Sequence, residues 1–305
     1  MAFNGKITKD PRDTLEMNFS DIHLNYVNLF FPKGNLNFNG NINGKAKIAD
    51  LYNKPTFHSN LTIDTLLLNN TEIGNTRITS KWINNKKEIG LNILSKRGNL
   101  NTVDMSGEYV PSNQSVQFDI NLDKVRMAIL NPILQKSFSD FNGALSGYLK
   151  LSGTLQNPTF NGRLFPHKTA FIIDYLKTRY NFTSTLDVTD NIINFDSVTV
   201  NDEGGNQAQV NGHLHFHSFK NIDYSFNINA QKLKSLNTSG FDNNIYYGEA
   251  FTSGPVSIQG NTQTKNLNID ASLKTENNTL INLPIGQSGK SQKAQFITFV
   301  NGKQT

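Results

Sequence analysis

The fold of this chain is decided by a phrase that reads Gly147-Tyr-Leu-Lys-Leu-Ser-Gly153-Thr-Leu-Gln-Asn-Pro158-Thr-Phe160-Asn-Gly162. An earlier copy reads Gly44-Lys-Ala-Lys-Ile-Ala-Asp-Leu-Tyr-Asn-Lys-Pro55-Thr-Phe57, and its first glycine lies 103 positions before Gly147. A degraded third copy begins at Gly254, 107 positions after Gly147, and has Lys265 where the other copies have proline. A long period that contains short strands is typical of a β repeat protein and not of one compact enzyme domain. Function is therefore expected on an extended surface or in a channel.

Apolar and polar residues alternate with a period of two along most of the chain. In the stretch 36–48, Leu36, Phe38 and Ile42 share one parity with further apolar residues and glycines, while asparagine and lysine fill the other parity. Successive residues of a strand point to opposite sides of the sheet, so this stretch has one apolar and one polar face. The same alternation occurs at 116–122, 208–216, 224–230 and 267–273, and turn-forming residues at 110–113, 201–205 and 261–263 separate such stretches.

Two stretches interrupt the alternation. Residues 125–138 space their apolar residues more like a helix, with Pro132 as an interruption or a new start, and we expect a short helix that covers one end or edge of a sheet. Residues 236–248 are expected to form a loop with at most one helical turn.

These patterns predict an all-β chain. We expect an elongated repeat β-taco, which is an open, β-helix-like groove of antiparallel strands with one or two short helices. The predicted organisation is a single elongated β repeat domain over 1–305, with repeat units near 34–142 and 143–249 and an incomplete unit at 250–305.

Composition narrows the class of protein. Of the 305 residues, 36% are hydrophobic, 17% charged and 10% aromatic, and the formal net charge is +5. The regular placement of the apolar residues argues against disorder. The basic residues are scattered, so no nucleic-acid interface is expected; the mild positive charge belongs to an ordinary solvated surface or attracts an anionic partner such as lipid headgroups. Cysteine is absent, which excludes disulfides and thiolate chemistry.

Neither a transmembrane helix nor a signal peptide is visible in the sequence. No stretch approaches the roughly 20 apolar residues that span a bilayer, and residues 1–6 continue directly into a strand-like pattern. Residues 296–300 resemble the beginning of another strand. We expect an internal or truncated piece of a larger protein.

The motifs that could carry chemistry are weak. His213, His215 and His217 alternate and so share one face of a strand, but this is the polar face, and no acidic residue or cysteine is expected to accompany them nearby. They are predicted to be surface histidines. Residues 286–291 resemble the end of a phosphate-binding loop, yet Pro284 takes the place of its first glycine. We therefore predict that the chain is not an enzyme and has no catalytic residue, cofactor or metal site.

Several phrases of the sequence, taken in order, resemble the TamB family. They are Leu145–Gly162, then Val198-Thr-Val-Asn-Asp202-Glu-Gly204 with Val210-Asn-Gly212-His-Leu, then Leu236-Asn-Thr238 with Tyr247-Gly248-Glu-Ala-Phe251-Thr-Ser-Gly254-Pro-Val256-Ser-Ile258-Gln-Gly260. The resemblance covers about residues 120–285, whereas residues 1–119 share only the repeat pattern. The sequence of these phrases is similar to that of Bacteroidetes-type members of the family.

The resemblance implies a taco-like β groove, like that of AsmA-type proteins, in the inner-membrane subunit of a translocation and assembly module. It implies a place in the periplasm, an anchor in the inner membrane and contact with an outer-membrane TamA-type barrel. Anchor and barrel contact are both expected through segments outside this chain, which would have no other contact with a membrane. The family is associated with outer-membrane protein assembly and with carrying phospholipid between membranes.

Physical reasoning from the alternation agrees with a lipid role. Each buried CH₂ contributes about 0.8 kcal/mol, so shielding an acyl chain of about sixteen carbons is favourable by on the order of 12 kcal/mol. Roughly twenty strands spaced about 4.8 Å apart would make a groove on the order of 100 Å long. The predicted groove floor consists of Leu149, Leu151, Leu155, Phe160, Val210, Leu214, Phe216, Phe226, Ile228, Val256, Ile258 and Ile269.

Three alternatives remain open from the sequence. The floor residues could pack on one another in a closed β sandwich or β-helix instead of lining a groove. The chain could be a scaffold that inserts or translocates outer-membrane proteins together with a TamA-type barrel, by offering sheet edges to their strands. It could also be an extracellular β-helix enzyme or adhesin, because strands can bring distant carboxylates together.

Overall fold

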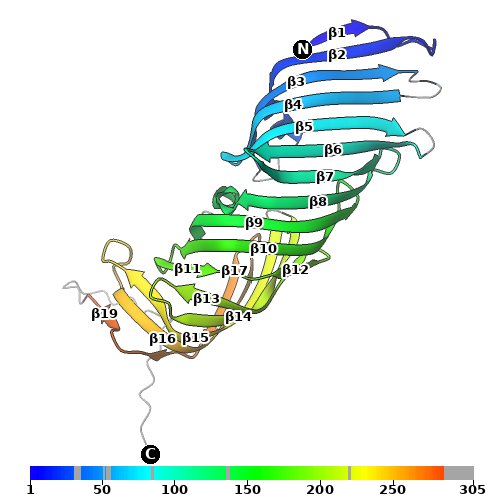
Figure 1. The fold of residues 1–305 in the computed structure, drawn as a ribbon. Coiled ribbons are helices and arrows are strands. Elements are labelled where there is room, and N and C mark those ends of the chain that lie inside the picture. The colour runs from blue at the N-terminus through cyan, green and yellow to red at the C-terminus, as the bar shows by residue number, and fades with distance from the viewer. Residues whose placement is uncertain are drawn as a thin grey trace, which may run out of the picture.

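The computed structural model describes residues 1–30, 36–50, 52, 56–83, 86–134, 138–218 and 221–284. Within these ranges, nineteen strands form one antiparallel sheet (Figure 1). The helical segments there are short: the 3₁₀ helices η1 (Leu24–Phe30) and η2 (Met127–Leu130) and the helix α1 (Asn131–Leu134). The prediction of an all-β chain with few helices is confirmed.

The strands follow one another as a meander. The first ten are β1 (Ala2–Gly5), β2 (Thr14–His23), β3 (Phe38–Ala49), β4 (Thr56–Leu68), β5 (Thr71–Ile83), β6 (Glu88–Arg97), β7 (Leu100–Val110), β8 (Ser115–Arg126), β9 (Phe138–Gly153) and β10 (Pro158–Ile173). The remaining strands are β11 (Thr178–Phe182), β12 (Leu186–Thr189), β13 (Ile192–Asp202), β14 (Gln207–Ser218), β15 (Asn221–Thr238), β16 (Tyr247–Asn261), β17 (Asn266–Ala271), β18 (Lys274–Thr275) and β19 (Leu280–Asn282).

The sheet is long and curls at its C-terminal end. β11 and β12 share the row between β10 and β13, and β17, β18 and β19 share the row beside β16, so the nineteen described strands make sixteen rows. At about 4.8 Å per row, the path along the sheet is about 70 Å, shorter than expected because the rows are fewer. Figure 1 shows the strands stacked from β1 at one end, with the last strands curling round at the other.

A recurring β-bulge bends the strands. At five positions a non-glycine residue adopts a positive φ of 50–54°, the register shifts there, and its backbone N–H donates a hydrogen bond to a side-chain oxygen on the next strand. The donor and acceptor residues are Asp21 with Asn43, Thr65 with Asn75, Lys124 with Ser146, Ser197 with Asn211, and Lys232 with Ser253. Bulges increase the local twist and bend of a strand. This repeated bend is what curves a long antiparallel sheet toward one face.

The helical segments lie at the ends of strands. η2 and α1 occupy most of the stretch in which a helix is predicted, although Val125 belongs to β8 and Phe138 to β9. Pro132 falls in the first turn of α1, where its missing N–H costs no hydrogen bond. Asn69, in the turn between β4 and β5, donates its side-chain N–H to the carbonyl of Ile129 in η2 at 2.9 Å. η1 is not expected from the sequence, and in the 236–248 stretch β15 continues to Thr238 before the turn.

The three copies of the repeated phrase occupy equivalent hairpins, at β3–β4, β9–β10 and β16–β17. Gly44 and Gly254 have φ values of +131° and +135°. A Cβ on Gly44 would lie 2.2 Å from the backbone carbonyl oxygen of Asn60 in β4, and a Cβ on Gly254 would lie 2.2 Å from that of Ser272, between β17 and β18. Glycine is therefore required at these two positions by both conformation and space. Pro55, the phosphate-loop-like 286–291 and the strand-like 296–300 lie outside the described residues.

We expect Gly254→Ala to lower the free energy of unfolding by about 2 kcal/mol, measured by urea denaturation. The added methyl group must displace the Ser272 carbonyl, and the short outer strands β17 and β18 can shift to relieve part of the clash. Gly205→Ala is the matched control, because Gly205 also has a positive φ (+83°) but has open space around its Cβ position. It should lose only about 1 kcal/mol. Equal losses would show that the Ser272 contact is not the cause.

Candidate functional site

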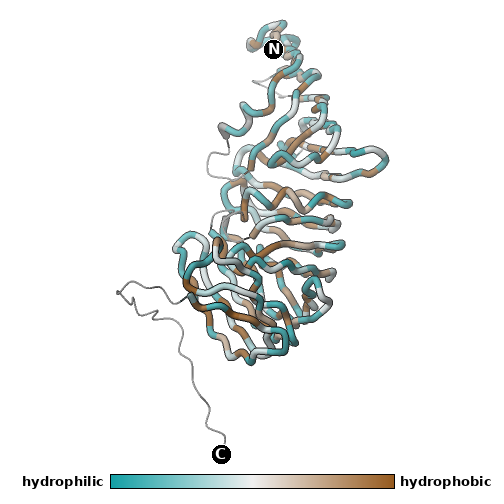
Figure 2. The backbone as a smooth tube through the Cα atoms, turned by 90° about the vertical axis from the view of Figure 1, so that its left-hand side faces the viewer, coloured by the Kyte–Doolittle hydropathy of each residue, from teal (hydrophilic) through white to brown (hydrophobic). Residues whose placement is uncertain are grey.

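One face of the sheet is apolar from β2 to β17. Directly opposed residues of neighbouring strands share a face, so the register traces one row of side chains across the sheet. Every member of this apolar row is hydrophobic or glycine: Phe19, Gly44, Leu61, Ile78, Ile93, Met105, Ile120, Leu149, Gly162, Val188, Ile193, Leu214, Tyr224, Gly260 and Leu267. Figure 2 shows hydrophobic and hydrophilic residues alternating along the strands.

The opposite face is polar along the same route. A row displaced by one residue from the apolar row contains Asn18, Lys45, Asn60, Thr79, Asn92, Ser106, Asp119, Lys150 and Asn161. Beyond it, Arg163 pairs with Asp187 through an ion pair of 2.7 Å, and this guanidinium–carboxylate hydrogen bond raises the pKa of Arg163. The sheet therefore separates an apolar surface from a charged and solvated one.

Eleven of the twelve predicted floor residues lie on the apolar face. Leu149 and Leu214 are members of the apolar row, Leu151 is opposed to Phe160, and Phe216 is opposed to Ile222. The others follow one another across neighbouring strands, in the orders Val210, Ile228, Val256 and Phe226, Ile258, Ile269. Ten of them are half-buried and so keep some contact with solvent. Ile269 is 56% exposed on the outer row. Leu155 lies in the turn between β9 and β10, is 62% exposed and is not part of the face.

The apolar face is partly packed on itself where the sheet curls. Leu164, Leu186, Val188 and Val198 form a buried cluster. Leu149, Phe160 and Val210 are among the half-buried residues that pack against it. A second cluster joins Tyr180 and Ala208 to Ala230 and Leu233 of β15. The face is thus a closed core around Val198 and a partly exposed surface on either side of it.

Paired hydroxyl groups interrupt the apolar face between β4 and β7. Ser59 and Ser80 are directly opposed and lie 2.5 Å apart between their Oγ atoms, and Thr76 and Ser95 do the same at 2.8 Å. Thr102, which is fully buried, donates to the carbonyl of Ile73 at 2.6 Å. Because each buried hydroxyl has a partner, these residues add little polarity to the face. These pairs cannot be predicted from the sequence, because a single serine or threonine in an alternating strand gives no indication of its partner on another strand.

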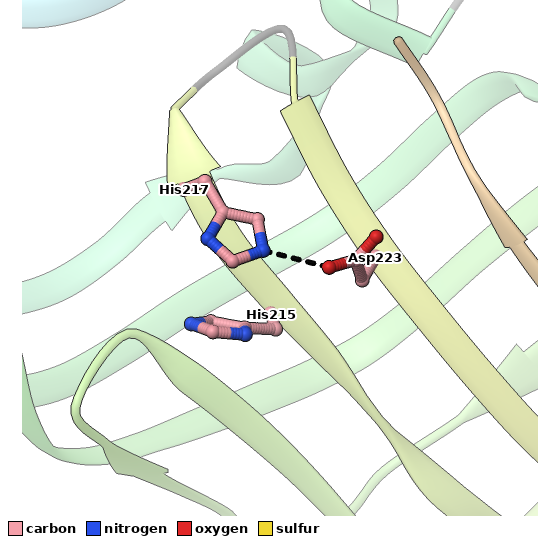
Figure 3. Close-up of side chains that lie close together, drawn as sticks. All are labelled: His215, His217 and Asp223. Atoms are coloured by element: carbon pink, nitrogen blue, oxygen red, sulfur yellow. Dashed lines mark hydrogen bonds and ion pairs between the residues drawn. The ribbon is translucent and has the colours of Figure 1, made fainter. Parts of the chain in front are cut away.

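The three alternating histidines lie on the polar face. His213 is opposed to Asn194 and Ser225, and His215 to Asp223. His217 Nε2 lies 2.6 Å from Asp223 Oδ2 (Figure 3). The expectation that no acidic residue accompanies the histidines is wrong, because Asp223 of the neighbouring strand β15 contacts His217.

Comparison with known families bears on the C-terminal part of the chain. Residues 196–305 match the family model of the TamB C-terminal domain. This match supports membership of the TamB family. The TamB resemblance of the sequence is thereby confirmed for residues 196–285, and for 120–195 it stays a prediction. No curated protein and no solved structure matches the chain.

The match to the TamB C-terminal domain indicates the general kind of protein to which this segment is similar. TamB-like proteins are cell-envelope proteins associated with transport and assembly in outer-membrane biogenesis, and the family is not known for catalysis. No helix within the described part of the chain has the length and apolar character needed to cross a membrane. The segment of this chain that matches the family model includes β14 to β17 and so carries the last four members of the apolar row, Leu214, Tyr224, Gly260 and Leu267.

Proposed function

We propose that the apolar face shields the acyl chains of phospholipid while the lipid moves between the two membranes of the envelope. The observation that supports this proposal is the apolar row, which runs from Phe19 to Leu267 without one polar side chain other than the Tyr224 hydroxyl. A surface of this kind offers no specific pocket. It suits a ligand that is held by burial of CH₂ groups and that must slide.

The partial exposure of the floor supports the same role. An acyl chain gains free energy only where apolar surface is still accessible to it, at about 25 cal/mol per Å². Leu214, Phe226 and Ile258 are half-buried and directly or diagonally opposed, so they offer such surface on three neighbouring strands. A headgroup would stay in water while its acyl chains lie on this face, and the net charge of +5 favours an anionic headgroup. We place this activity in the periplasm.

The test is native mass spectrometry with lipid extraction on the purified chain. Wild type should carry phospholipid, and the double variant Leu214→Asp/Phe226→Asp should lose at least nine-tenths of it, because each carboxylate on the floor would have to be desolvated against an acyl chain. The matched control is His213→Asp/Ser225→Asp, which places the same charges one residue away on the polar face. It should retain the lipid.

Circular dichroism establishes that each variant is folded. Ile269→Asp provides a second test that does not depend on a buried position, since Ile269 is already exposed at the end of the same face. It should reduce the bound lipid severalfold. The proposal is wrong if wild type carries no phospholipid, or if the floor variants carry as much as the polar-face control.

A protein-assembly scaffold is the second candidate, and the outer row of strands supports it. β17 is exposed along its whole length, and Leu267 and Leu280 of the outer row are 60% and 66% exposed. An exposed outer strand can pair with a strand of another protein such as a TamA-type barrel or its client. Photo-crosslinking from position 268 would capture a strand partner in this case, whether or not the floor carries a charge.

A further inference from the structure

A second site lies on the polar face, away from the apolar row. His215, His217 and Asp223 come together at the β14–β15 hairpin, and their potential ligand atoms all lie within 4.8 Å of one another (Figure 3). The two imidazole rings are 4.0 Å apart between centroids. The site faces solvent, with the His217 and Asp223 side chains 41% and 47% exposed.

The local fold explains how the three residues meet. Residues two apart in a strand point to the same side, so His215 and His217 share a face. Asp223 is directly opposed to His215 across the β14–β15 ladder. The register shifts after Phe216, and this irregularity carries His217 over Asp223, to 2.6 Å between Nε2 and Oδ2.

A third strand orients the carboxylate. Asn261 of β16 donates its side-chain N–H to Asp223 Oδ1 at 2.6 Å, which leaves Oδ2 directed to the histidines. Asn261 and His217 thus each contact one of the two carboxylate oxygens of Asp223. Outer residues that hold a ligand in this way are typical of metal sites, where they fix its orientation.

We propose that His215, His217 and Asp223 bind a divalent transition-metal ion of the Zn²⁺ class. Two imidazoles and one carboxylate suit Zn²⁺, Co²⁺ and Ni²⁺, whereas Mg²⁺ and Ca²⁺ prefer sites made of oxygen ligands alone. Tetrahedral bonds of about 2.0–2.1 Å place neighbouring ligand atoms about 3.3 Å apart. His217 and Asp223 must therefore separate by less than an ångström, which their exposed side chains allow.

The ion would tie the ends of β14 and β15 together and keep one coordination position toward solvent. Water or a donor atom of another protein can occupy that position. Bound metal stabilises a fold that binds it better than the unfolded chain does, so a metal-dependent rise in melting temperature follows. This inference is independent of the lipid proposal, because the site lies on the opposite face of the sheet.

Equilibrium dialysis of the untagged chain against ZnCl₂ tests the inference. We expect one saturable Zn²⁺ per chain, a higher melting temperature with Zn²⁺, and no competition from a large excess of Mg²⁺. His215→Gln and His217→Gln should each weaken binding at least tenfold. His213→Gln is the matched control, since His213 lies two residues away on the same face but outside the cluster, and it should change binding less than twofold.

Cobalt provides a second readout that does not depend on affinity. Co²⁺ bound by two imidazoles and a carboxylate in a tetrahedral site should give a visible absorption band that Asp223→Asn removes. Absence of saturable Zn²⁺ binding would overturn the inference, as would equal weakening by His213→Gln. Binding that survives His217→Gln unchanged would also overturn it, because the metal would then lie elsewhere.

Discussion

Replacing Val198 by aspartate is expected to unfold the C-terminal half of the sheet. Val198 is 1% exposed and lies in the buried cluster with Leu164, Leu186 and Val188. A carboxylate there would have no partner, and burying it should cost more than about 4 kcal/mol. Since folded domains are stable by only about 5–15 kcal/mol, urea denaturation followed by circular dichroism should show a large loss. Val198→Ala should lose only about 2 kcal/mol.

The adjacent residue gives the control. Thr199 is opposed to Gln209 on the other face and accepts a hydrogen bond from its side-chain N–H at 2.9 Å. Thr199→Asp keeps an acceptor in a position that solvent reaches, so we expect a change of at most about 1 kcal/mol. Similar stabilities for the Val198→Asp and Thr199→Asp variants would mean that water reaches the cluster. The closed core described around Val198 would then be wrong.

The face of each strand could be predicted from the sequence because alternation is a local property. Leu214 and Phe226 are placed on the same face by parity within their own strands, and the register only confirms that both strands present that face to the same side. At Leu155, alternation does not predict the face correctly. It continues the alternation of β9, but the chain has already entered the turn before Pro158, so parity no longer has a meaning there.

The curvature of the sheet could not be predicted. The bulges occur at residues such as Lys124 and Ser197, whose types show no preference for a positive φ. What stabilises them is an acceptor on the next strand, Ser146 or Asn211, at a sequence distance that varies from one bulge to another. The contact between Asp223 and His217 could not be predicted either, because the two residues lie on different strands. A contact across strands depends on the register, and the register is set by the turns and bulges of the whole sheet.

Asp202 is expected to stabilise the closure of the curl. Its carboxylate is nearly buried and accepts hydrogen bonds at 2.9 Å from the backbone and side-chain N–H groups of Asn206 and from the backbone N–H of Lys234 in β15. Tyr180, opposed to Asp202, donates to the carbonyl of the same Lys234 at 2.7 Å, and burial raises the pKa of Tyr180 to about 12. Tyr180 of β11 therefore binds the backbone carbonyl of Lys234, and Asp202 of β13 binds its backbone N–H.

Asp202→Ala should lower the free energy of unfolding by about 3 kcal/mol at neutral pH, because three hydrogen bonds to a charged acceptor are lost. Glu203→Ala, at the exposed neighbouring position, should change it by less than about 0.5 kcal/mol. Burial opposes ionisation of Asp202, but the hydrogen bonds from Asn206 and Lys234 outweigh it and lower the pKa of Asp202. Its pKa is thus lower in the folded chain than in the unfolded one.

The pH dependence follows from this sign. A carboxylate with a lowered folded-state pKa contributes its stability above the unfolded pKa, near 4, and loses that contribution as the pH falls through the folded value. The difference between wild type and Asp202→Ala should therefore be constant at neutral pH and shrink progressively below about pH 4. Urea denaturation across this range measures the difference directly. If it is independent of pH, the loss comes from the removed packing of the side chain and not from its charge, and the closure of the curl does not depend on an ionised Asp202.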